Sequence, residues 1–267
     1  MEPGLHNVPT FTRYIGVDYS GAETPTSSLR GLRVYSATPN SAPVEVSPPP
    51  SPRRYWTRRG LAEWLATELV KDERALVGID HGFSFPLAYF TKYGLAHDWP
   101  AFLDDFQRHW PTDHDVYVDF VRTGLLGNAA ARVGDPNWFR LTELRTGTAS
   151  SVFNFNARQR NVAKSTHSGI PWLRYIRNNT QGKVHFWPFD GWDPPAGKSV
   201  VVEVYPRLWS KNYPRADRTP DQHDAYSVAA TLCQADQDGT LAKWLSPKLT
   251  PEEKETASIE GWILGVS

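Results

Sequence analysis

The chain has 267 residues, 40% of them hydrophobic, and its 29 basic side chains balance its 29 acidic ones. This length suits one large α/β domain with insertions or two small domains, and the apolar content allows a sizeable core. A formal net charge of zero excludes a protein coated with non-specific nucleic-acid contacts, although it leaves room for a local basic groove.

Cys233 is the only cysteine, so the chain forms no intramolecular disulfide and suits a reducing compartment. The first residues have neither the basic nor the apolar region of a signal peptide. No stretch approaches the roughly 20 apolar residues that span a bilayer. The sequence therefore predicts a cytoplasmic protein that does not act at a membrane.

Apolar or alternating runs predict four strands in the first 80 residues, at 13–18, 32–36, 43–46 and 75–80. Between the last two, Thr57 can cap a helix with an apolar face. A right-handed crossover then places the fourth strand parallel to the first. If these two strands are neighbours, Asp18 and Asp80 end them about 4.8 Å apart.

Residues 88–180 are expected to form a largely helical insertion, with helices near Pro100, over 116–121 and around Ile170. From residue 121 to 182 there are nine basic residues and two acidic ones, interleaved with aromatic residues, while residues 98–119 are rich in aspartate. Such a basic and aromatic segment can bind phosphates and stack on bases. Its candidates for substrate contact are Arg158, Arg160 and Lys164.

A further strand is predicted at 199–205, followed by a helix that starts at Thr219-Pro220-Asp221-Gln222 and ends near Gln234. Helical spacing puts Asp221 and Asp224 at the top of the buried stripe of this helix. The helix dipole explains an acid in the first turn, as at Asp221, but it does not explain Asp224. Residues Thr250-Pro251-Glu252-Glu253 predict one more helix start.

Carboxylates stand at the ends of the apolar runs: Asp18, Asp80 and Glu203 close predicted strands, and Asp224 heads an apolar helical stripe. A carboxylate at the tip of a buried strand loses solvation unless a cation or hydrogen bonds compensate. Carboxylates gathered in this way usually hold a hard divalent metal such as Mg²⁺ or Mn²⁺. We therefore expect these four acids to form a metal site.

Two further residues, His81 beside Asp80 and Arg207 near Glu203, are candidates for substrate contact. Both have simpler interpretations, because His81 can be a supporting residue and Arg207 can pair with Glu203. The chain has no GxSxG, HExxH, paired CxxC or GxGxxG motif, so serine hydrolase, zinc protease and dinucleotide-binding classes lack support.

Several segments together resemble the family called domain of unknown function 429, whose members are described as predicted nucleases with a ribonuclease H fold. The matching segments are Tyr14-Ile15-Gly16-Val17-Asp18, Trp187-Pro188-Phe189-Asp190, Val202-Glu203-Val204-Tyr205-Pro206, His223-Asp224-Ala225-Tyr226 and Glu260-Gly261-Trp262-Ile263-Leu264-Gly265. The resemblance runs from about residue 13 to 266. It implies one ribonuclease-H-like α/β domain over 1–267, with a mixed five-stranded sheet in the order 3-2-1-4-5, flanked by helices.

The resemblance also implies a metal-dependent nuclease that hydrolyses phosphodiesters of nucleic acid, with Asp18, Asp80, Glu203 and Asp224 as its catalytic residues. The same four acids, with Asp221 as a fifth, are its implied metal ligands. Two alternatives are open. One is a nucleotide-dependent phosphotransferase or ATPase of the actin-like branch of the same superfamily, and the other is a non-catalytic binding module stabilised by metal.

Overall fold

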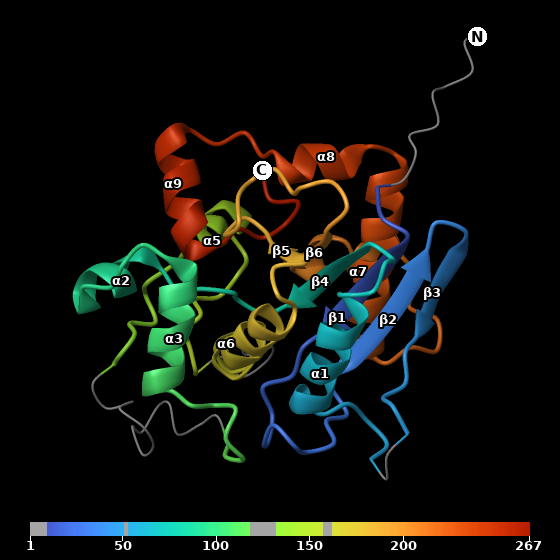
Figure 1. The fold of residues 1–267 in the computed structure, drawn as a ribbon, viewed down its shortest axis with the longest axis horizontal. Helices are drawn as coiled ribbons and strands as arrows, with labels where there is room; N and C mark the ends of the chain where they lie inside the picture. The colour runs from blue at the N-terminus through green and yellow to red at the C-terminus, as the bar shows by residue number, and fades with distance from the viewer. Residues whose placement is uncertain (1–9, 51–52, 118–131, 157–161) are drawn as a thin grey trace.

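The computed structural model describes residues 10–50, 53–117, 132–156 and 162–267, which form a mixed sheet flanked by helices (Figure 1). The strands are β1 (Arg13–Asp18), β2 (Arg33–Thr38), β3 (Ser41–Glu45), β4 (Ala75–Asp80), β5 (Val184–Phe186) and β6 (Ser199–Glu203). The helices are α1 (Arg58–Glu68), α2 (Leu87–Tyr93), α3 (Trp99–His109), α5 (Leu141–Thr146), α6 (Val162–Asn179), α7 (Pro220–Gln237), α8 (Thr240–Leu245) and α9 (Pro251–Glu260), with short 3₁₀ turns η2 (Pro206–Leu208) and η3 (Ser210–Asn212).

The sheet has six strands in the order β3-β2-β1-β4-β6-β5, so the expected number of five is wrong. Strands β1, β4, β6 and β5 pair in parallel, while β2 and β3 are antiparallel to their neighbours. The added strand is β5, at the edge next to β6. Its three residues, Val-His-Phe, are too few to produce the alternation that identifies a strand in a sequence.

Helix α7 covers one face of the sheet, and α1 and α6 cover the other (Figure 1). Two glycines that are partners in neighbouring strands, Gly16 and Gly78, let α7 approach closely. A Cβ atom at Gly16 would lie 2.2 Å from the carbonyl oxygen of Ala225 in α7. Because successive strand residues point to opposite faces, Gly16 and Gly78 fix which side chains face α7.

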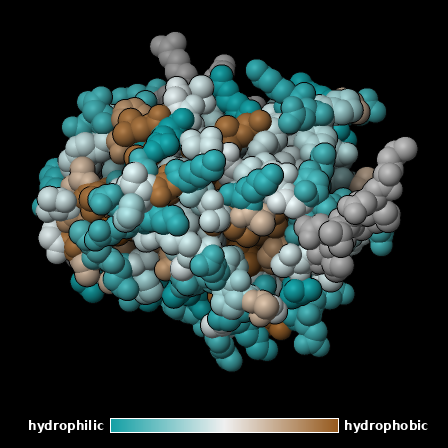
Figure 2. Space-filling view, turned by 90° about the horizontal axis from the view of Figure 1, so that it is seen from above, coloured by the Kyte–Doolittle hydropathy of each residue, from teal (hydrophilic) through white to brown (hydrophobic). Residues whose placement is uncertain are grey.

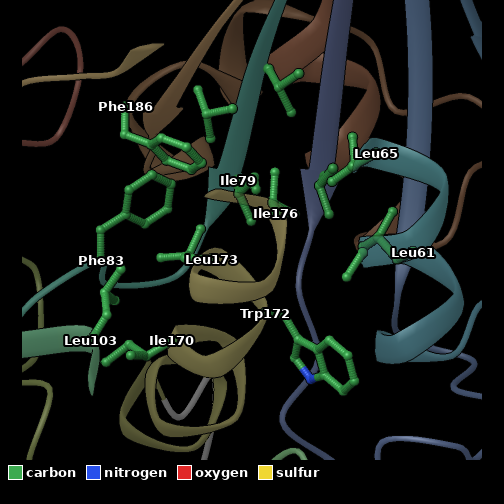
Figure 3. Close-up of a cluster of buried hydrophobic side chains, with 14 of the residues drawn as sticks. Leu61, Leu65, Ile79, Phe83, Leu103, Ile170, Trp172, Leu173, Ile176 and Phe186 are labelled. Atoms are coloured by element: carbon green, nitrogen blue, oxygen red, sulfur yellow. The ribbon is translucent and has the colours of Figure 1, made fainter. Parts of the chain in front are cut away.

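The insertion contributes to the core on the other face. Ile170, Leu173 and Ile176 of α6 pack beside Ile79 of β4, and Leu61 and Leu65 of α1 complete this layer (Figure 3). This confirms the helix expected around Ile170. The helix expected over 116–121 is absent at 116–117, and its other residues lie outside the described part of the chain.

Three threonines cap helices as the sequence predicts. Thr57, Thr219 and Thr250 each accept a hydrogen bond from a backbone N–H in the first turn of α1, α7 and α9. Figure 2 shows the molecule from above relative to the view of Figure 1. This surface is mostly hydrophilic, and its apolar groups are separated from one another. Among the described helices, none combines the length and apolar character needed to cross a bilayer.

Candidate functional site

Asp18 and Asp80 are partners at the ends of adjacent parallel strands, as expected. Each lies two residues beyond a glycine that faces α7, so alternation directs both carboxylates to the α7 face. Both side chains are partly buried. The pair is therefore at the carboxyl end of the parallel strands, where open α/β sheets bind their ligands.

Helix α7 brings Asp221 and Asp224 to the same end of the sheet. Near its C-terminus, Asp236 accepts hydrogen bonds from the backbone N–H of Phe11 at 2.9 Å and from the hydroxyl of Tyr14 at 2.7 Å. These contacts hold the end of α7 near the start of β1, so α7 runs antiparallel to β1 and begins near Asp18. Asp224 is 6% exposed, as its helical spacing predicts.

Asp221 lies close to the loop that follows Asp18. A Cβ atom added at Gly31 would lie 3.7 Å from a carboxylate oxygen of Asp221 and 3.6 Å from the hydroxyl of Ser20. Four of the five predicted carboxylates thus gather at one end of one face of the sheet.

Glu203 lies apart from the aspartates. Its partner in β4 is Ile79, one residue before Asp80, so its side chain points to the α1 and α6 face. It is 3% exposed and accepts hydrogen bonds from Arg140 at 2.6 and 2.8 Å and from the backbone N–H of Phe83 at 3.0 Å. These contacts compensate its charge within the protein.

The buried partners of Glu203 form a charged network that no sequence pattern marks. Arg140 also contacts Glu143 at 2.9 Å, and both are almost fully buried. Glu260 accepts hydrogen bonds at 2.6 Å from the backbone N–H groups that begin α2 and α5. Burial raises the pKa of both Glu143 and Glu260. The Glu-Val-Tyr-Pro and Glu-Gly-Trp-Ile-Leu-Gly segments, which are distant in the chain, meet in this network.

The structure buries His81 instead of presenting it to a substrate. The imidazole is 2% exposed, stacks edge-on against Tyr19, and lies where a Cβ atom at Gly169 of α6 would come within 2.4 Å of its Nε2 atom. Burial lowers the pKa of His81 to about 4, so the ring is neutral near pH 7. On the α6 face, His81 packs the segment after Asp80 against α6.

The backbone of Lys164 lies beside the loop that follows Asp18. The backbone of Lys164 in the first turn of α6 packs so closely on the loop after Asp18 that a Cβ atom at Gly21 would lie 2.4 Å from its carbonyl carbon. Arg207 is exposed in η2. Arg158 and Arg160, also expected to bind substrate, lie outside the described residues.

The loop after Asp18 is held by Arg58, which sequence reasoning missed. Its buried guanidinium donates hydrogen bonds to the carbonyl oxygens of Ser20 at 3.2 Å, Ala22 at 2.5 Å and Glu23 at 3.1 Å. As the first residue of α1, Arg58 ties this helix to the carboxyl end of β1. No local pattern marks it, because an arginine in a first helical turn is ordinarily solvated.

The arginines of residues 121–182 that the structure describes each pair with an acid from outside this segment. The ion pairs are Arg132–Asp105, Arg140–Glu203, Arg145–Glu253, Arg174–Asp104 and Arg177–Asp190. The excess of positive charge along the sequence therefore does not produce an equal excess on the surface that the structure describes.

These acids do not by themselves supply a complete set of metal ligands. In the described ranges, no three His, Cys, Asp or Glu side chains are arranged to hold a metal ion. Asp18, Asp80 and Asp224 each already interact with another group of the chain. Mg²⁺, however, commonly uses one or two carboxylates and completes its shell with waters and substrate phosphates. The Asp18–Asp80 pair suits that kind of site and does not form a preformed cage.

Comparisons with known proteins give no further guidance. No family model matches the chain. No curated protein and no solved structure matches it either. The resemblance to domain of unknown function 429 therefore stays a prediction, and function has to be inferred from the residues of the site.

Proposed function

We propose that the protein is a nuclease that hydrolyses phosphodiesters with the help of Mg²⁺ or Mn²⁺. The observation that carries this proposal is the pairing of Asp18 with Asp80 at adjacent parallel strand ends, on the face to which α7 brings Asp221 and Asp224. A pair of carboxylates joined by a substrate phosphate is a common arrangement for Mg²⁺ in phosphoryl-transfer sites.

In this proposal, Asp18 and Asp80 hold the metal, and Asp224 and Asp221 complete or support its shell. A divalent ion in this place would stabilise negative charge on the phosphate and lower the pKa of a bound water. Arg58 keeps the loop after Asp18 in place, and the backbone of Lys164 packs against the same loop. We leave Glu203 out of the metal ligands because its charge is already compensated by Arg140.

We further propose that the fold is ribonuclease-H-like and that the protein acts in the cytoplasm. Three antiparallel strands followed by a parallel fourth, with a late helix beside their carboxyl ends, support the fold assignment. Cys233 is a buried free thiol, which is consistent with a reducing compartment.

The test is hydrolysis of labelled single-stranded DNA and RNA in Mn²⁺ by the wild type, Asp18→Asn and Asp80→Asn. Each variant keeps the side-chain shape but removes a charge, so we expect activity to fall about 100-fold or more. Asp104→Asn is the matched control, because Asp104 is an exposed acid on α3 that pairs with Arg174. Equal activity in the wild type and both site variants would contradict the proposal, as would no Mn²⁺-dependent activity in any of them.

A further inference from the structure

A second basic segment stands immediately before α7. Between Pro206 and Thr219 the chain carries Arg207, Lys211, Arg215 and Arg218 with a single acid, Asp217. Arg207, Lys211 and Arg215 are exposed. We call these three residues the basic strip.

The basic strip is anchored beside the carboxylates. His223, in the first turn of α7, bonds the carbonyl oxygen of Ser210 at 2.9 Å through its Nε2 atom. At the other end of the segment, the guanidinium of Arg218 lies 3.7 Å from the ring centre of Tyr226, also in α7. The segment is thus fixed against the same two turns of α7 that carry Asp221 and Asp224.

The strip differs in its pairing from the arginines of the insertion that the structure describes. Among the residues that the structure describes, Arg207, Lys211 and Arg215 make no ion pair, whereas Arg145, Arg174 and Arg177 of the insertion do. A paired cation has its charge largely cancelled locally, while an unpaired exposed cation can neutralise a phosphate and release the counterion condensed on the nucleic acid there. Within the described part of the chain, the strip is therefore better suited to a polyanion than these ion-paired arginines of the insertion.

We propose that the basic strip binds the phosphate backbone of a nucleic acid and leads it to the aspartates at the start of α7. This inference rests on the proposed nuclease function, because it concerns how that site takes its substrate. The contacts involve phosphates only, so binding depends strongly on salt and little on base sequence.

The experiment measures binding of a fluorescent single-stranded 20-nucleotide DNA by anisotropy, in EDTA and at several salt concentrations. It compares the wild type with Arg207→Gln/Lys211→Gln/Arg215→Gln. The control is Arg145→Gln/Arg174→Gln/Arg177→Gln, which removes the same amount of charge from partly exposed, ion-paired arginines. Melting temperatures establish that all three proteins are folded.

We expect the strip variant to bind at least about tenfold more weakly than the wild type and to lose about two units of slope in log K against log salt, since each single-strand phosphate contributes about 0.7. The control should keep the wild-type slope. Equal losses in the two variants would overturn the proposal, and so would an absence of wild-type binding.

Because this assay contains no metal and needs no turnover, it separates the strip from the nuclease. If Asp18→Asn abolishes hydrolysis while the strip variant binds like the wild type, the strip is wrong and the nuclease stands. If the strip variant loses binding and no protein hydrolyses DNA or RNA, the surface stands and the nuclease proposal fails.

Discussion

Two buried histidines make the stability of this protein sensitive to acid. Burial lowers the pKa of His81 to about 4 and that of His167 to about 3, against an ordinary value near 6.5. Between these values the unfolded chain binds protons that the folded protein excludes. The free energy of unfolding therefore falls as pH drops from about 6.5 towards 4, by about 1.4 kcal/mol per pH unit for each histidine.

We predict that His81→Gln reduces this slope by about 1 kcal/mol per pH unit between pH 6 and 4.5, because His81 no longer takes up a proton on unfolding, whereas His167 and His185, whose pKa values are also lowered by burial, still do. Urea unfolding at several pH values measures it. Glu143 and Glu260, whose raised pKa values favour the folded state as pH falls, act in the opposite direction in both proteins and cancel in the comparison. A slope unchanged by His81→Gln would mean that His81 is already protonated or exposed in the folded state.

Individual residues also show which parts of the site could be predicted from the sequence. Asp18 and Asp80 could be predicted to meet because each ends a strand and a crossover makes the strands parallel. Glu203 also ends a strand, but one residue of register turns it to the opposite face, and no sequence pattern fixes that register. Arg58 and Glu260 were missed because their partners are backbone groups distant in sequence.

At the scale of elements, the buried charged network links β6, α9, α2 and α5, which are distant in the chain. Glu203 lies in β6 and binds Arg140, the residue that precedes α5. Glu260 ends α9 and caps both α2 and α5. A buried ion pair that loses one partner leaves an uncompensated charge, which costs about 3–5 kcal/mol.

We predict that Arg140→Met lowers the free energy of unfolding by about that amount, because Glu203 and Glu143 would keep buried charges without their cation. Arg145→Met is the matched control, since Arg145 pairs with Glu253 on the partly exposed surface and should cost less than about 1 kcal/mol. Urea unfolding of both variants provides the comparison. Similar losses in the two would show that the network contributes no more than a surface pair.

Elements also show where local patterns succeed and where they fail. Threonine caps followed by proline identify α7 and α9 because the capping interactions are local. The edge strand β5 is too short to carry a pattern. In the sequence, residues 121–182 resemble a phosphate-binding surface. The acids that pair with their arginines come from α3, α9 and residue 190, and only tertiary packing brings these partners together.

At the scale of the whole molecule, the sheet separates two kinds of acidic residue. On the α7 face, Asp18, Asp80, Asp221 and Asp224 gather at the strand ends beside the exposed basic strip. On the α6 face, Glu203 belongs to a compensated network that holds helices to the sheet. A substrate that follows the strip would therefore reach the aspartates without contacting Glu203.

The most direct test of whether the aspartates and not Glu203 bind the metal is a crystal structure of the protein with Mn²⁺ and a short phosphorothioate DNA. Anomalous scattering would locate the metal. We predict a Mn²⁺ peak at Asp18 and Asp80 with a phosphate oxygen completing its shell, and no peak at Glu203, whose carboxylate stays bound to Arg140. A Mn²⁺ ion bound by Glu203, or no ion at the aspartate pair when the DNA is in place, would contradict the account.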